Sequence, residues 1–243
     1  MAAELNPLEQ FEIKRLIPLH IGQVDISFTN SALFMIVAVL LATALLVIGT
    51  RRAQLVPGRL QSVAELSYEF IANMIEENVG TEGMRYFPFI FTLFMFVLFG
   101  NLIGMVPYTF TYTSHIIVTF ALAAVIFIGV TMIGLTRHGF HFFTLFAPQG
   151  VPWPLLLLLV PIELISYFIR PFTLSIRLFA NMLAGHAILA VFAGFVAALG
   201  ILGIAPLAMD VGFMLLEFLV AALQAYIFTI LTCLYLNDAI HLH

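Results

Sequence analysis

The sequence predicts an all-α polytopic membrane protein, and three observations support this: composition, the scarcity of charge and the length of the apolar runs. Of the 243 residues, 63% are hydrophobic and only 9% are charged, whereas soluble domains carry about 25% charged residues. Several uncharged runs reach about 20 residues, the length that crosses the ~30 Å core of a bilayer. We therefore expect a single membrane domain over residues 1–243, with about five spanning helices and one amphipathic surface helix.

The first 80 residues predict one span and the surface helix. Residues 1–30 are polar and interrupted by prolines, so we expect a short surface helix or an extended segment on the outer side. The uncharged run 31–50 predicts the first span, and Arg51 and Arg52 directly after it indicate a cytoplasmic end. Residues 60–79 carry apolar side chains at helical spacing with glutamates between them, which predicts an amphipathic helix lying on the membrane.

Residues 86–136 predict two further spans. The loop at 107–114 has no basic residue and can face outside, whereas Arg137 marks the inner side again. Asn101 is a polar residue inside the first of these spans. On its own it is also explained by a hydrogen bond between helices, which is common in membranes.

Residues 153–238 predict two helices that are too long to stand upright in a bilayer. At 1.5 Å per residue, residues 153–198 measure ~69 Å and residues 206–238 measure ~50 Å, against a core of ~30 Å. Pro161 and Pro171 allow the first helix to bend. We therefore expect a strongly tilted, near-horizontal helical hairpin joined by an uncharged turn.

Each of these long apolar helices carries one polar stripe. The residues of the two stripes are spaced by seven, namely Glu163, Arg170 and Arg177, and then Asp210, Glu217 and Gln224. A spacing of seven returns a side chain to nearly the same helix face. If the helices run antiparallel, the two stripes can face each other.

The order of the residues along an antiparallel hairpin predicts two proton-exchanging groups at different depths. His186 and Glu217 fall in the outer half, and Glu163, Tyr235 and Asp238 gather in the inner half. Histidine exchanges protons near neutral pH, whereas Arg177, between the groups, stays charged and cannot relay a proton. The hypothesis is a split proton path whose halves are joined by a mobile carboxylate on another protein.

Four stretches of the sequence are similar to subunit a of the rotary ATP synthases. They are LSIRLFANMLAGH at 174–186, PIELISYFIRP at 161–171, LQAYIFTILTCLYL at 223–236 and GNLIGMVP at 100–107. The resemblance implies the stator proton channel of the synthase, which couples proton translocation to rotation and ATP synthesis and has no catalytic activity of its own. It implies a c-ring, peripheral-stalk b-type subunits and membrane lipid as partners, with no nucleic acid, cofactor or metal. It also implies the bacterial inner membrane or, alternatively, the mitochondrial inner membrane.

The resemblance also assigns site residues. Arg177 falls on the essential arginine that faces the carboxylates of the rotating c-ring. Five residues fall on the outer half-channel: Asn101, Asn181, His186, Glu217 and Gln224. Glu163 and Asp238 fall near the inner half-channel, where their order along the hairpin also puts Tyr235. Some members have an acid at the place of Gly104, so no carboxylate acts there in this chain.

Several of these polar residues are also compatible with a purely structural role. Structural pairing would account for Glu163 with Arg170 and for His186 with Glu217, and packing hydrogen bonds would account for Asn181 and Gln224. An intramembrane enzyme is a second function class, but Ser175 has no glycine-rich loop and only His138 and His141 lie close together. A secondary transporter is a third class, and it predicts internal repeats that the sequence lacks.

Overall fold

The computed structural model describes residues 11–18, 20–21, 24–25, 27–51, 53–106, 109–146 and 152–241. Two short antiparallel strand pairs precede the first helix. β1 (Arg15–Ile17) pairs with β4 (Phe28–Thr29), and β2 (His20–Ile21) pairs with β3 (Val24–Asp25). Of the two expected forms of this segment, its described part therefore takes the extended one.

Helix α1 (Asn30–Thr50) begins where Thr29 accepts a hydrogen bond from the amide of Ala32. Its buried residues are all small, namely Ser31, Ala38, Ala42 and Gly49. Small side chains let helix backbones approach closely, and α1 packs in this way against α2 (Arg59–Val79) and α3 (Phe87–Gly104). Helix α2 is amphipathic, with Ile71 and Ile75 fully buried.

Helices α3 (Phe87–Gly104) and α4 (Ile116–His138) both pack against α6 (Ile204–Ile240). A 3-10 turn, η2 (Thr81–Tyr86), leads into α3, and η3 (Tyr112–Ser114) lies between the two helices. A further 3-10 segment, η4 (Gly139–Leu145), follows α4. Helix α3 contacts α1, α2 and α6, so the main core lies around it.

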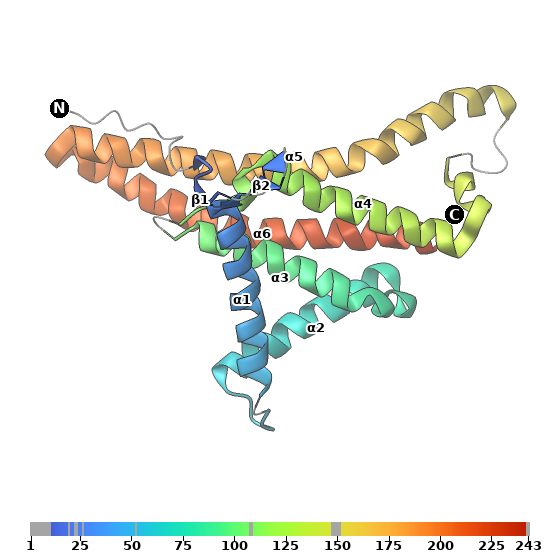
Figure 1. The fold of residues 1–243 in the computed structure, drawn as a ribbon, viewed down its shortest axis with the longest axis horizontal. Coiled ribbons are helices and arrows are strands. Elements are labelled where there is room, and N and C mark those ends of the chain that lie inside the picture. The colour runs from blue at the N-terminus through green and yellow to red at the C-terminus, as the bar shows by residue number, and fades with distance from the viewer. Residues whose placement is uncertain are drawn as a thin grey trace.

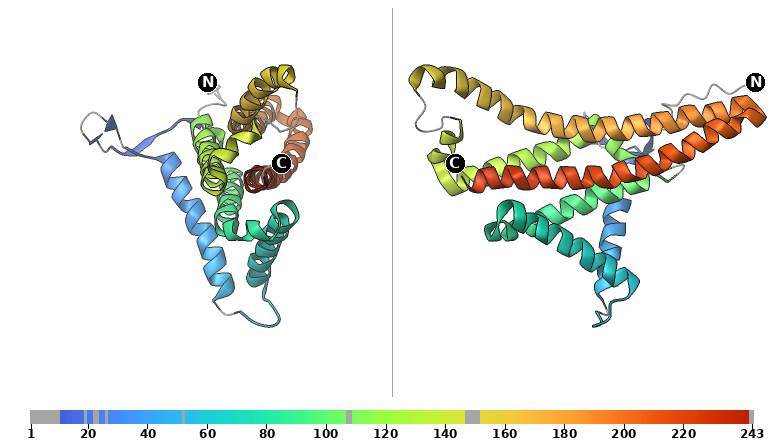
Figure 2. Two further views of the ribbon diagram at one scale, coloured as in Figure 1. Left: turned by 90° about the vertical axis from the view of Figure 1, so that its right-hand side faces the viewer. Right: turned by 180° about the vertical axis from the view of Figure 1, so that it is seen from behind.

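The C-terminal half is a hairpin of two very long helices, α5 (Trp153–Leu199) and α6 (Ile204–Ile240), joined by η5 (Gly200–Gly203). Their 47 and 37 residues correspond to about 70 and 55 Å. Figures 1 and 2 show them side by side and crossing α1 at a steep angle, with α5 bending away toward its N-terminal end. Pro161 and Pro171 both lie inside α5, which continues through them.

Five helices in the described part are long and apolar enough to cross a membrane. They are Asn30–Thr50, Thr81–Gly104, Ile116–Phe142, Trp153–Leu199 and Ile204–Ile240. The predicted all-α fold with several membrane spans is confirmed, and the strands are limited to the short N-terminal pairs among the described residues.

Helix α6 buries polar residues while it exposes several large apolar ones. Glu217, Gln224 and Thr229 are at most 5% exposed, whereas Leu215 and Leu219 are at least 60% exposed. In water this arrangement would be unfavourable because large apolar side chains would lose the benefit of burial. In lipid it is expected, since the outer side chains contact hydrocarbon and the inner polar groups find partners.

Candidate functional site

His186 on α5 joins three other parts of the chain. Its Nδ1 atom lies 2.5 Å from Glu217 Oε1 on α6 and 3.0 Å from the carbonyl of Met182. Its Nε2 atom lies 2.9 Å from the carbonyl of Gly104 and 3.0 Å from Thr111 Oγ1. We call Gly104, Thr111, His186 and Glu217 the histidine cluster. The structure thus brings His186 and Glu217 together, as the antiparallel hairpin predicts.

Two glycines make room for this cluster. A Cβ atom on Gly185 would lie 2.6 Å from Glu217 Oε1, and one on Gly104 would lie 2.4 Å from Thr111 Oγ1. Both distances are well below the ~3.3 Å of a close carbon–oxygen contact. The absence of side chains at these positions therefore lets the carboxylate and the hydroxyl approach the ring.

The histidine cluster has the geometry of a proton-exchanging pair. Both ring nitrogens of His186 face hydrogen-bond acceptors, which suits a doubly protonated ring beside an ionised Glu217. The alternative, a neutral ring beside a protonated carboxyl, differs by the position of one proton. Both carboxylate oxygens of Glu217 are buried, and neither has a hydrogen bond of good geometry among the described residues; Oε1 is held by the ion-pair contact with His186. Oε2 has room to bind water.

Three amide side chains continue inward from the histidine cluster. Asn101 Nδ2 donates to the carbonyl of Ala221 over 3.1 Å, and Asn181 Nδ2 donates to Gln224 Oε1 over 2.9 Å. These bonds agree with a packing role. However, Asn101 Oδ1 and Gln224 Nε2 are buried without a hydrogen-bond partner in the described part. Unused buried polar atoms of this kind are typical places for ordered water.

A second cluster lies toward the other end of the hairpin. Arg170 forms a 2.8 Å ion pair with Asp238, and its guanidinium lies 5.6 Å from the ring centre of Tyr167 and 5.1 Å from that of Tyr235. We call these four residues the arginine–aspartate cluster. The sequence predicted Tyr235 and Asp238 as site residues. It placed Arg170 on the polar stripe of α5 without assigning it a role. It missed Tyr167, whose hydroxyl lies 2.6 Å from Thr131 Oγ1.

Glu163 is not in contact with this cluster. No hydrogen bond or ion pair joins Glu163 to Arg170, Tyr235 or Asp238 in the part of the chain that the structure describes. The alternative pairing of Glu163 with Arg170 is therefore wrong. Seven residues separate the two by ~10 Å along the helix, whereas Asp238 reaches Arg170 from the facing helix.

Arg177 lies between the two clusters, on the exposed face of α5 that is not packed against the other helices. It is exposed and forms no hydrogen bond or ion pair with the described residues. Nine residues separate it from His186, which turns the two side chains to opposite sides of the helix. Small exposed side chains flank Arg177 along this face, at Thr173, Ala180 and Ala184. The guanidinium therefore stands on a shallow strip that a partner helix can approach.

Phe11 of the N-terminal segment and the residues between α3 and α4 lie beside the histidine cluster. The His115 ring stacks on Phe110 at 5.1 Å, and Phe11 lies 6.1 Å from the His186 ring. Burial lowers the pKa of His115, and a hydrogen bond to the Phe11 backbone partly opposes this. Burial also raises the pKa of Tyr112, whose hydroxyl donates to the carbonyl of Phe96 over 2.9 Å. The sequence signal for these contacts was the run of hydroxyl and aromatic residues at 107–114.

The alternative enzyme sites are not assembled in the described part of the chain. No group of three histidine, cysteine, aspartate or glutamate side chains with metal-binding geometry occurs there. His138 Nε2 lies 3.0 Å from the carbonyl of Ile240. Ser175 is buried and bonded to Thr119, with no histidine base beside it.

Comparison with known proteins identifies the family. Residues 32–237 match the family described as ATP synthase A chain. The chain is 60% identical over 239 residues to "ATP synthase subunit a" of Rhodospirillum rubrum, covering 98% of this chain and 99% of the relative. It is 58% identical over 245 residues to the protein of the same name from Paramagnetospirillum magneticum, with 98% and 99% coverage. This chain therefore belongs to the ATP synthase A chain family.

Proposed function

We propose that this chain is the stator proton-channel subunit of an F-type ATP synthase, and one observation carries the proposal. Arg177 is an exposed, unpaired charge near the middle of a 47-residue apolar helix, among the residues that the structure describes. A bare arginine in hydrocarbon costs at least ~2.5 kcal/mol on insertion scales, and more in simulations. Its face therefore needs a partner that supplies a negative charge, water or both.

A carboxylate on a rotating c-ring meets this need. At 4 Å and an effective dielectric of ~20, an ion pair with Arg177 is attracted by roughly 4 kcal/mol before desolvation. A membrane potential supplies ~2.3 kcal/mol per charge per 100 mV. Because the two energies are comparable, Arg177 favours the ionised carboxylate as it passes without trapping the rotor. The small residues beside Arg177 allow the ring helices to come close.

The two clusters serve as the two half-channels. Protons reach the ring from the outer side through His186 and Glu217 and then past the amides of Asn101, Asn181 and Gln224. They leave on the inner side by way of Glu163, Tyr235 and Asp238. His186 and Arg170 are 16 residues apart on α5, about 24 Å, which is too far for direct transfer. Only a rotating carrier connects the two half-channels, and Arg177 blocks direct proton transfer between them.

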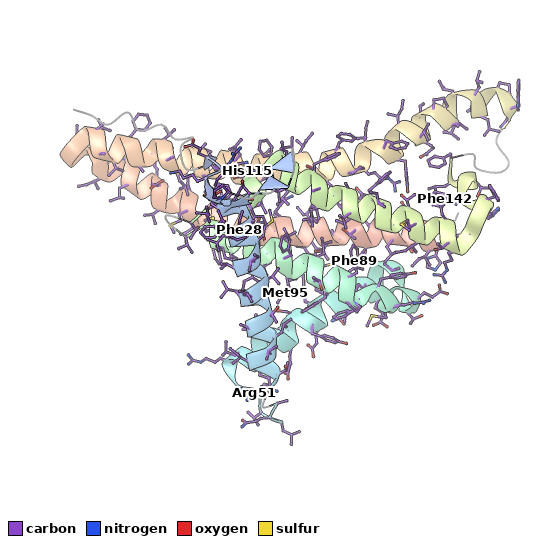
Figure 3. The ribbon with its side chains drawn as sticks, in the orientation of Figure 1. Phe28, Arg51, Phe89, Met95, His115 and Phe142 are labelled. Carbon is purple, nitrogen blue, oxygen red and sulfur yellow. The ribbon has the colours of Figure 1, made fainter. Side chains whose placement is uncertain are left out.

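The charge distribution supports the orientation of the chain. Figure 3 shows Arg51 at one end of α1, with Phe28 and His115 near the other. By the positive-inside rule, the Arg51 end is cytoplasmic, so the histidine cluster and its covering segments face the outer side. The relatives named above are bacterial, which supports the bacterial inner membrane as the location. The subunit contributes a proton path, while catalysis and the peripheral stalk belong to other subunits.

The test is Arg177→Ala in inverted membrane vesicles that carry the whole synthase. We expect ATP-driven acidification to be lost, while passive proton flow through complexes stripped of the soluble head is retained or raised. Thr136→Ala is the control and should leave pumping unchanged, because Thr136 is exposed on α4, away from this strip, and its hydroxyl bonds only to the carbonyl of Ile133 in the described part. Normal pumping by the Arg177 variant would refute the proposed role.

A further inference from the structure

A pocket opens beside His186, on the side away from Arg177. It has a volume of about 330 Å³ and lies between the end of α3, the middle of α5 and the start of α6. His186, Thr109 and Asp210 line it, together with small or apolar residues such as Gly104 and Ala190. This volume holds several water molecules. It therefore provides space for a hydrated path to the ring of His186.

Asp210 contributes the one acidic side chain of this pocket among the described residues. Its Oδ1 atom is buried and has no hydrogen-bond partner in the described part. Within the described lining, the titratable side chains are His186 from α5 and Asp210 from α6. The segment after α3 contributes Met105, Val106 and Thr109, none of which is titratable. Glu217 lies two turns further along α6. No ion pair or helix-capping hydrogen bond within the described residues gives the Asp210 carboxylate a structural role.

We propose that Asp210 is the proton-collecting group at the outer mouth of the path, a role that rests on the function proposed above. The Asp210 carboxylate takes a proton from hydronium in the outer water and becomes a neutral carboxyl. It then gives that proton to water in the pocket and returns to its ionised form. The water passes the proton to the His186–Glu217 pair. No group is consumed, so the cycle repeats.

Position and charge both favour this role over a structural one. Asp210 lies seven residues before Glu217, or ~10 Å along the helix, which a short water chain spans. A fixed negative charge in a cleft raises the local concentration of a cation and its rate of capture. Protons are scarce in neutral and alkaline water, so this capture limits the flow there. A carboxylate with unused oxygen atoms serves this purpose better than one held in an ion pair.

The experiment measures passive proton flow in inverted vesicles stripped of the soluble head, in which the lumen contacts the outer side of the subunit. A potassium diffusion potential drives protons outward from a lumen buffered at about pH 8 or about pH 6. Asp210→Asn is expected to lower the flow by roughly three- to tenfold at the alkaline lumen and by less than about twofold at the acidic one. Asp210→Glu should restore the flow, and an immunoblot of the assembled complex reports loss of folding.

Glu12→Gln is the matched control, because Glu12 is an exposed carboxylate on the same side that does not line the pocket. It should leave the flow unchanged at both lumenal pH values. A uniform loss in Asp210→Asn, no loss at the alkaline lumen, or an equal effect of Glu12→Gln would each overturn the proposal. Arg177→Ala, measured in parallel, separates the two failures. If it pumps normally, the proposed function fails, whatever Asp210 does.

Discussion

Gly185→Ala is the sharpest test of the histidine cluster. An added Cβ atom would lie 2.6 Å from Glu217 Oε1 and 2.7 Å from its carboxyl carbon. A carbon–oxygen contact needs about 3.3 Å, so the carboxylate must retreat by roughly 0.7 Å. The 2.5 Å contact between His186 and Glu217 would then lengthen to about 3.2 Å, the upper limit of a hydrogen bond.

The expected cost follows from two opposing terms. The close His186–Glu217 ion-pair contact is valued like a hydrogen bond to a charged group, at about 1.5–3 kcal/mol, whereas replacing glycine by alanine inside a helix gains about 1 kcal/mol. The net loss is therefore roughly 0.5–2 kcal/mol. We also expect passive proton flow to fall by about tenfold, since losing ~1.4 kcal/mol of the pair's interaction reduces its population by that factor.

The assay is passive proton flow in stripped vesicles, together with thermal unfolding of the purified complex. Gly194→Ala is the control, because Gly194 lies on the same helix and a Cβ atom there meets nothing within 4 Å. It should be neutral or slightly stabilising. Wild-type flow in Gly185→Ala would refute the reasoning, because the pair would then tolerate separation without consequence.

Three further outcomes are expected. Asn181→Ala leaves the buried Gln224 without its partner and should destabilise the protein by about 1–2 kcal/mol in thermal unfolding; an unchanged melting temperature would contradict this. The Arg170–Asp238 side chains are 26% and 40% exposed, so a double-mutant cycle with Arg170→Gln and Asp238→Asn should give a coupling of less than about 1 kcal/mol, and a coupling above about 2 kcal/mol would refute it. Burial holds the pKa of His115 below its usual value, so the unfolded chain binds more protons below that usual value and stability should fall as pH drops through it. His115→Phe should flatten this slope in unfolding curves recorded across that range, and an unaltered slope would count against a role for His115 burial.

Apolar runs and helical periodicity predicted the helices closely. The apolar runs at 31–50 and 153–198 correspond to helices at 30–50 and 153–199, and the amphipathic segment at 60–79 corresponds to a helix at 59–79. For the apolar runs the reason is physical: in hydrocarbon every backbone group must bond within its own helix, so apolar length almost alone determines helix length. The short strands before α1 lack such a constraint, and the sequence left their form open.

The contacts of the site were only partly predictable. The order of residues along an antiparallel hairpin correctly put His186 and Glu217 at the same depth, because that order is readable along the chain. The spacing by seven misled at Arg177, which is exposed on the side of α5 opposite His186 and does not face the stripe of α6.

The sequence could not predict that Asp238 is the partner of Arg170. That pairing depends on the axial register of two helices, and the paired residues are 68 positions apart. Thr111 was missed because it reaches His186 from a loop, where no periodicity fixes the direction of a side chain.

The four contacts of His186 have a mechanical consequence. The ring fastens the end of α3, the loop after it and both long helices at a single point, because its two nitrogens touch groups from all of them. A ring that gives up one proton can no longer donate to acceptors on both sides. In the proposed path, a proton that leaves the ring removes one of these hydrogen bonds, so His186 would also set how firmly the hairpin is held to the rest of the subunit.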